Sequence, residues 1–143
     1  MSGFAQNHSS DLAWLLKGLA DEVPAIRGCV LLSSDGLTKA MHGLERTNAE
    51  YLAALASGLF SMTRSASAEF DGGSEVRQIA AELHSSQLFI SWAGYNSVLA
   101  VLADGSADPA VVGFEMSRLI GSVRPFLDTA TRSAAATAGE RMR

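Results

Sequence analysis

Three histidines, His8, His42 and His84, are the side chains best suited to metal binding or proton transfer near neutral pH. His8 lies in a polar N-terminal stretch, and the other two lie at the ends of predicted strands. Neither His42 nor His84 has a second ligand at the short helical or hairpin spacing that a metal site requires, and His8 is expected in a flexible end. We therefore expect no metal site.

Residues 84–86, with the sequence His-Ser-Ser, contain a base and a nucleophile side by side. A hydrolytic site also needs an acidic group that orients the histidine, and no such group is identifiable. Residues 69–75 gather acidic side chains around two glycines, but their spacing does not match a calcium-binding loop. Both segments are interpreted as turns.

Motifs that bind nucleotides or build a nucleophile are missing from the chain, including the P-loop, the dinucleotide-binding glycine pattern and the Gly-x-Ser-x-Gly elbow. Cys29 is the single cysteine, so no disulfide forms within the chain, and its apolar neighbours predict a buried thiol. We expect no catalytic centre and no cofactor, which favours a binding function.

The composition is that of one globular domain of 143 residues with a net charge of −4. No segment concentrates basic and aromatic residues, so nucleic acid is not an expected partner. No apolar run approaches the ~20 residues that cross a bilayer, and the N-terminus lacks a secretory pattern. A cytoplasmic protein without membrane insertion is expected.

Hydrophobic periodicity and turn residues predict eight elements in the order α-β-β-α-β-β-β-α, an α/β (α+β) fold with an antiparallel sheet. The first helix is expected from Ser9 or Ser10 to Pro24, and a capping box at Thr47–Glu50 opens the second. Asp108 is predicted to cap the last helix, which Pro125 kinks. The other predicted elements are strands over residues 26–33, 37–42, 75–84, 87–93 and 97–103, and a middle helix over residues 47–69.

The middle helix carries two stripes. Leu52, Leu55, Ala56, Leu59 and Thr63 are predicted to pack on the sheet. Beside them lies a face of small side chains around Gly58. Such a face suits the close approach of a second helix, or it is simply an exposed surface in an alanine-rich protein, and the pattern alone leaves both open. The small residues are Ala54, Ser57, Gly58, Ser61 and Ser65.

Residues 23–28, Val-Pro-Ala-Ile-Arg-Gly, lead into the first strand, and residues 34–37, Ser-Asp-Gly-Leu, form its hairpin turn. With the element order, they make residues 11–132 resemble the roadblock family, in particular the bacterial, actinobacterial branch that acts with small Ras-like GTPases. The resemblance implies a five-stranded antiparallel sheet between one long helix and two terminal helices. Flexible ends are expected at 1–8 and 133–143, around a roadblock domain over 9–132.

The resemblance further implies a homodimer formed through the middle helix and the strand that follows it. It implies partners as well: a Ras-like small GTPase, contacted by Arg46 and Arg64, and a sensor kinase complex. Two other hypotheses remain, a passive scaffold for the kinase complex and a small-molecule sensor whose pocket Trp92, Phe89 or Tyr95 lines. The predicted dimer interface comprises Ala54, Leu55, Ser57, Gly58, Ser61, Met62, Ser65, Val76, Gln78 and Ala80.

Overall fold

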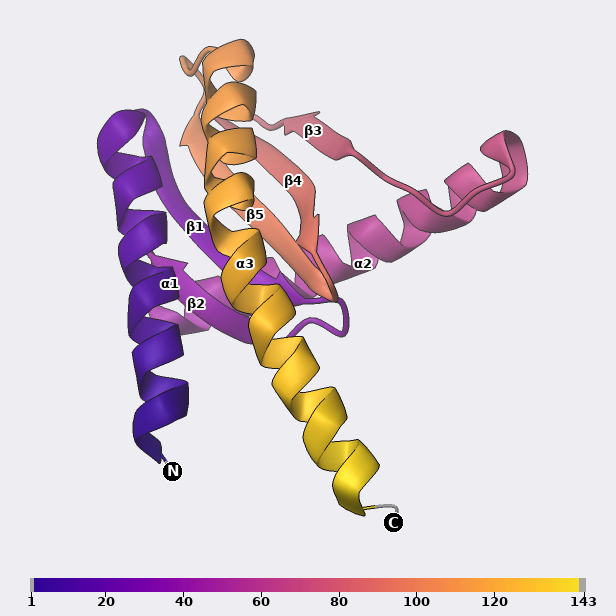
Figure 1. The fold of residues 1–143 in the computed structure, drawn as a ribbon. Helices are drawn as coiled ribbons and strands as arrows, with labels where there is room; N and C mark the ends of the chain where they lie inside the picture. The colour runs from indigo at the N-terminus through magenta and orange to yellow at the C-terminus, as the bar shows by residue number, and fades with distance from the viewer. Residues whose placement is uncertain (1, 142–143) are drawn as a thin grey trace.

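The computed structural model describes the backbone of residues 2–141 and the side chains of residues 11–125. Five antiparallel strands form one sheet in the order β2-β1-β5-β4-β3, so β2 and β3 are its two edges. The predicted fold class and element order are confirmed (Figure 1). The elements are α1 (Ser2–Glu22), β1 (Ile26–Ser33), β2 (Thr38–His42), α2 (Arg46–Asp71), β3 (Gln78–Glu82), β4 (Ser86–Gly94), β5 (Ser97–Asp104) and α3 (Pro109–Arg141).

The sheet separates two hydrophobic cores because successive side chains of a strand point to opposite faces. In β1, Cys29 and Leu31 join the core beneath α1 and α3, whereas Val30 and Leu32 join the core beneath α2. Helices α1 and α3 contact each other on one face of the sheet, and α2 crosses the other face (Figure 1). The fold therefore has three layers.

Turn and cap chemistry place several element ends where the sequence predicts them. Gly36 adopts a positive φ of 90° in the β1–β2 turn, a conformation that glycine adopts without steric cost. The Asp108 carboxylate accepts a hydrogen bond of 3.0 Å from the backbone N–H of Ala110, and Pro109 is the first residue of α3. Helix α3 continues past Pro125 to Arg141.

Three predicted limits are wrong. Helix α1 begins at Ser2 and not at Ser9 or Ser10, because no proline interrupts the polar N-terminal stretch and the helix continues through it. Helix α2 has Glu45 at its N-cap with no side-chain hydrogen bond, so Thr47 lies inside the helix and forms no capping box. Strand β3 spans five residues, which leaves Val76 before the strand.

The domain limits 9–132 and the flexibility of the two ends stay predictions. Helix α1 covers residues 2–8, and α3 covers residues 133–141 of the predicted tail. Residues 1, 142 and 143 lie outside the described part of the chain.

Candidate protein-interaction surface

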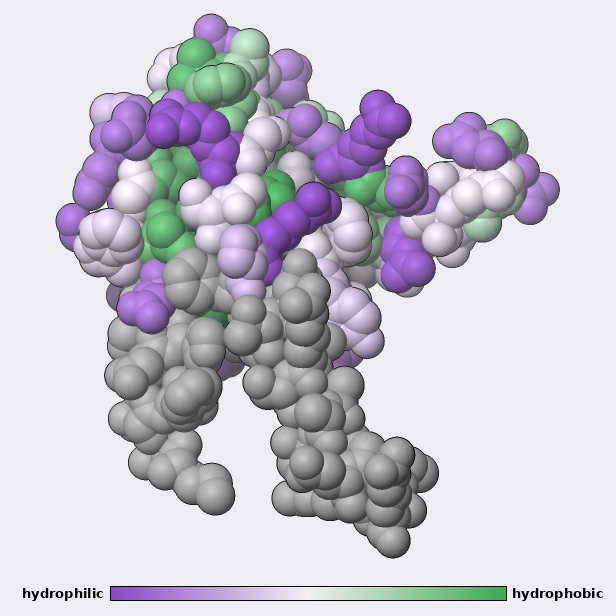
Figure 2. All heavy atoms as spheres, in the orientation of Figure 1, coloured by the Kyte–Doolittle hydropathy of each residue, from purple (hydrophilic) through white to green (hydrophobic). Residues whose placement is uncertain are grey.

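Helix α2 has a covered first half and a projecting second half. Its buried residues are Ala49, Leu52, Ala53, Ala56 and Phe60, and none follows Phe60 in a helix that ends at Asp71. Figure 1 shows the second half extending away from the sheet before the chain returns to β3. Figure 2 shows hydrophilic and hydrophobic residues together on this projecting end. Within the described residues, one end of a long helix therefore lacks a packing partner.

The outer side of α2 exposes apolar side chains next to very small ones. Leu55 is 43% exposed and Met62 is 64% exposed. A Cβ atom added at Gly58 would meet nothing within 4 Å, so the backbone there is accessible to a neighbour. Contiguous exposed apolar surface of this kind is typical of an interaction site. We call Ala54, Leu55, Gly58, Ser61, Met62 and Ser65 the α2 face.

The stripe that packs on the sheet differs from the predicted one. Leu55 was expected against the sheet but is exposed, and Phe60 is buried there. The alanines Ala49, Ala53 and Ala56 are fully buried, because small side chains let the helix backbone lie close to the strands. The helix is therefore rotated about its axis relative to the prediction. The alanine-rich sequence does not indicate this rotation, since alanines are equally compatible with the buried and the exposed face.

Ser57, which was predicted in the dimer interface, is half-buried and bonded within its own chain. Its hydroxyl donates a hydrogen bond of 2.7 Å to the backbone oxygen of Ser34 in the β1–β2 turn. This bond helps to fix the first half of α2 on the sheet. The interface role of Ser57 stays a prediction.

Strand β3 presents an open edge beside the projecting helix. It pairs with β4 from Gln78↔Ser91 to Glu82↔Gln87, and no described strand pairs with its other side. Gln78 and Ala80 are exposed. Unpaired backbone groups at such an edge are a template for another strand. Val76, just before the strand, is partly buried against the α2 core.

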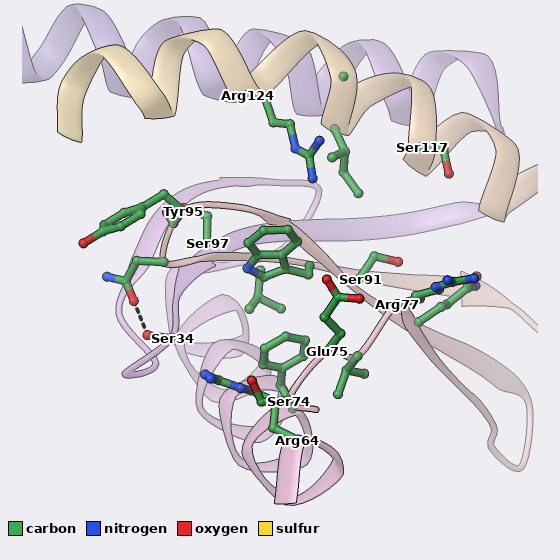
Figure 3. A pocket seen from close by; sticks show the side chains of 18 residues that line it. Ser34, Arg64, Ser74, Glu75, Arg77, Ser91, Tyr95, Ser97, Ser117 and Arg124 are labelled. Atoms are coloured by element: carbon green, nitrogen blue, oxygen red, sulfur yellow. Dashed lines mark hydrogen bonds between the residues drawn. The ribbon is translucent and has the colours of Figure 1, made fainter. Parts of the chain in front are cut away.

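A groove of about 860 Å³ lies between α2, the segment before β3, the end of β4, and α3 (Figure 3). Arg64, Arg77 and Arg124 line it, and the Arg124 guanidinium lies 5.3 Å from the centre of the Trp92 ring. Ser34 donates a hydrogen bond to the side-chain oxygen of Asn96 at one end of the groove (Figure 3). We call this site the arginine groove.

Two of the three aromatic residues considered for a pocket line the arginine groove, namely Trp92 and Tyr95. Phe89 does not, because it is 1% exposed and belongs to the core beneath α1 and α3. Its neighbour in sequence, Ile90, faces the opposite core, as strand alternation requires.

Residues 12–103 match the model of the Roadblock/LC7 domain, which covers the fold from α1 to β5. The chain belongs to the Roadblock/LC7 domain family. No functionally curated protein matches the sequence closely enough to count as a relative.

Solved structures with the same fold include a Streptomyces Roadblock/LC7 domain and two MglB proteins. A Roadblock/LC7 domain from Streptomyces avermitilis is 52% identical, with a TM-score of 0.78 over 80% of this chain and 96% of that one. An MglB protein in a tetrameric arrangement is 17% identical, with a TM-score of 0.77 over 86% and 92% of the two chains. MglB of Myxococcus xanthus is 16% identical, with a TM-score of 0.75 over 84% and 90%. At this identity the MglB structures share the fold.

The roadblock fold separates the residues with catalytic potential. His42 ends the edge strand β2, whereas His84 precedes β4 next to the opposite edge, and the side chain of His8 lies outside the described part. Among the described residues, no three His, Cys, Asp or Glu side chains gather into a metal-binding group. Likewise, no helix in the described part is long and apolar enough to traverse a bilayer.

The other side chains with reactive groups make structural contacts or are buried. Arg27 donates hydrogen bonds to the Ser86 hydroxyl at 2.7 Å and to the Asp104 carboxylate at 2.9 Å, which ties the turn at residues 84–86 to β1 and β5. Hydrogen bonds from Ser106 and Arg27 lower the pKa of Asp104 to about 2. Burial raises the pKa of the Cys29 thiol to about 12, so this cysteine stays protonated and unreactive.

Proposed function

We propose that this protein is a non-catalytic, cytoplasmic adaptor that acts as a homodimer and binds a Ras-like small GTPase, whose nucleotide state or location it regulates. The observation that carries the proposal is the uncovered α2 face beside the open edge of β3, in a chain of the Roadblock/LC7 family. Exposed apolar surface of this kind commonly marks a site of protein interaction. Regulation of a GTPase through its own switch loops needs no catalytic group in the regulator.

Two complementary features of the chain support the proposed homodimer. Two copies of the α2 face can approach closely because Gly58, Ser61 and Ser65 keep bulky side chains out of the contact. Around the same axis, two β3 edges would each satisfy the other's unpaired backbone groups. The tetrameric arrangement of a related MglB supports self-association of this fold.

Arg46 and Arg64 are the candidate contacts to the GTPase, and they lie at different ends of α2. Eighteen residues of helix separate them, or about 27 Å at 1.5 Å per residue. Arg46 is 76% exposed on its side chain and forms an ion pair of 3.9 Å with Glu50. Arg64 lines the arginine groove. One protomer therefore offers two separate basic contact points for an acidic GTPase surface.

Addition of the purified protein to Ras-like GTPases of the same organism is expected to give one complex and to change GTP hydrolysis or nucleotide exchange. Arg46→Ala is expected to weaken that complex about fivefold, which is the usual order for one exposed charged contact. Arg118→Ala is the matched control, because Arg118 pairs with Glu115 on α3, away from α2. Calorimetry measures the binding, and phosphate release measures the hydrolysis.

The absence of binding, or binding without any change in hydrolysis, exchange or location, would contradict the regulatory proposal. Capture of a sensor kinase complex without a GTPase would instead favour the scaffold hypothesis. The sensor hypothesis keeps one specific observation in its favour, the aromatic residues Trp92 and Tyr95 in the arginine groove. A metabolite that co-purifies with the protein would support that hypothesis.

A further inference from the structure

We propose that the arginine groove is a docking site for an acidic, extended segment of a partner protein. The site goes beyond the proposed function, because it requires neither a particular GTPase nor nucleotide. The partner is defined by its chemistry: several carboxylates around an apolar side chain.

The arginine groove is a positively charged site on a negatively charged protein. The chain carries a net charge of −4, yet three arginines line this one groove. Four of the other basic side chains in the described part are held in ion pairs with carboxylates. Arg64, Arg77 and Arg124 form no ion pair with any described residue. Glu75 is the single carboxylate among the lining residues, so the groove has a formal charge of +2.

The three arginines are placed so that they can contact one ligand from several sides. The three arginines come from α2, from the segment before β3 and from α3, so they surround the groove on different walls. Figure 3 shows Arg124 reaching from α3 into the groove, with Arg64 on the opposite wall. The Trp92 ring holds the Arg124 guanidinium in place through a cation–π contact of 5.3 Å. Ordered cations lose less conformational entropy when they bind an anion than free side chains do.

The lining between the arginines fits a peptide that is not purely acidic. Phe60, Val76 and Ile120 supply apolar surface, and Ser91 and Ser117 supply hydroxyl groups. An apolar side chain flanked by carboxylates would contact both kinds of surface. The volume and shape of the groove also fit an extended peptide, because the groove of about 860 Å³ is open between two helices and does not enclose its ligand.

Val76 and Gln78 of the predicted dimer interface also line the groove, so its β3 side adjoins the proposed dimer contact, whereas its α3 wall does not. Arg124, Ser117 and Gly121 lie on α3, on the face of the sheet opposite to α2 (Figure 1). Two copies that pair through the α2 face leave this wall accessible. The competing occupant is a second copy of the chain, whose α2 tip carries Glu69, Phe70 and Asp71, with Phe70 84% exposed.

The test uses the full chain and a fluorescein-labelled peptide with the sequence Glu-Glu-Phe-Asp-Glu-Glu. Fluorescence anisotropy is expected to show binding that weakens with added salt, whereas the neutral peptide Gln-Gln-Phe-Asn-Gln-Gln does not bind. Arg77→Gln and Arg124→Gln are each expected to lower the affinity about fivefold, and Arg118→Gln leaves it unchanged. In a Trp14→Phe background, the peptide is expected to change Trp92 emission.

Glu75→Gln is a control for misfolding, because a misfolded variant would lose affinity and this variant is expected to gain it. Removal of the single groove carboxylate is expected to raise the affinity two- to fivefold, roughly the size of one exposed charge contact. No binding of the acidic peptide, or equal affinity in all variants, would overturn the proposal. It would also be overturned if Arg77→Gln and Arg124→Gln dissociated the dimer in sedimentation, since the groove would then belong to the homodimer. GTPase binding is measured separately, so either proposal can fail alone.

Discussion

Gly58→Leu is expected to convert the proposed homodimer into a monomer. The substituted side chain projects from the α2 face into the space that the second helix would occupy, and overpacked contacts typically cost 1–3 kcal/mol or more. Two symmetry-related copies introduce the clash twice. Sedimentation velocity is expected to show the 15.0 kDa chain in place of a species of twice that mass.

The monomer produced by Gly58→Leu is expected to stay folded. A side chain at this position meets nothing within its own chain, and leucine in place of glycine favours the helix by about 0.8 kcal/mol. Gly18→Leu on α1 is the matched control, because Gly18 is another helical glycine with nothing within 4 Å and lies off the α2 face. An intact Gly58→Leu dimer, or equal dissociation of both variants, would refute the assigned face.

Phe89→Ala is expected to destabilise the domain by about 3–5 kcal/mol. The ring is 1% exposed in the core beneath α1 and α3, so its removal leaves a cavity that the surrounding strands and helices fill only in part. Urea denaturation at one fixed protein concentration measures the loss, because the proposed dimerisation would make stability depend on concentration.

Trp92→Ala is the comparison for Phe89→Ala. Trp92 is 44% exposed in the arginine groove, so its removal is expected to cost less stability than the loss of Phe89. Equal or reversed effects of the two substitutions would mean that Phe89 contributes to the groove and not to the core.

The sequence predicts the sheet well because its strands carry strong local signals. The range of β1 over residues 26–33 and the turn at Gly36 follow from an apolar run bounded by turn residues. The cap of α3 at Asp108 follows from one Asp-Pro pair. Each signal depends on residues within a few positions of the element that it defines.

The sequence predicts less where the outcome depends on tertiary contacts. Rotation of α2 buries Phe60 and exposes Leu55, and only the sheet beneath the helix decides between them. Strand β3 pairs with β4 only from Gln78↔Ser91 to Glu82↔Gln87, and alternation along residues 75–84 does not reveal these limits. The arginine groove unites Arg64, Arg77 and Arg124 from distant parts of the chain, and no spacing in the sequence indicates their convergence.

The central claim, that the α2 face joins two copies of the chain, is tested most directly by cysteine cross-linking. Ser61→Cys places a thiol on the α2 face, and buried Cys29, with its pKa raised to about 12, does not compete. A bismaleimide is expected to yield a covalent dimer from Ser61→Cys and none from Ser122→Cys on α3. A Ser61→Cys chain that remains at 15.0 kDa would contradict the account.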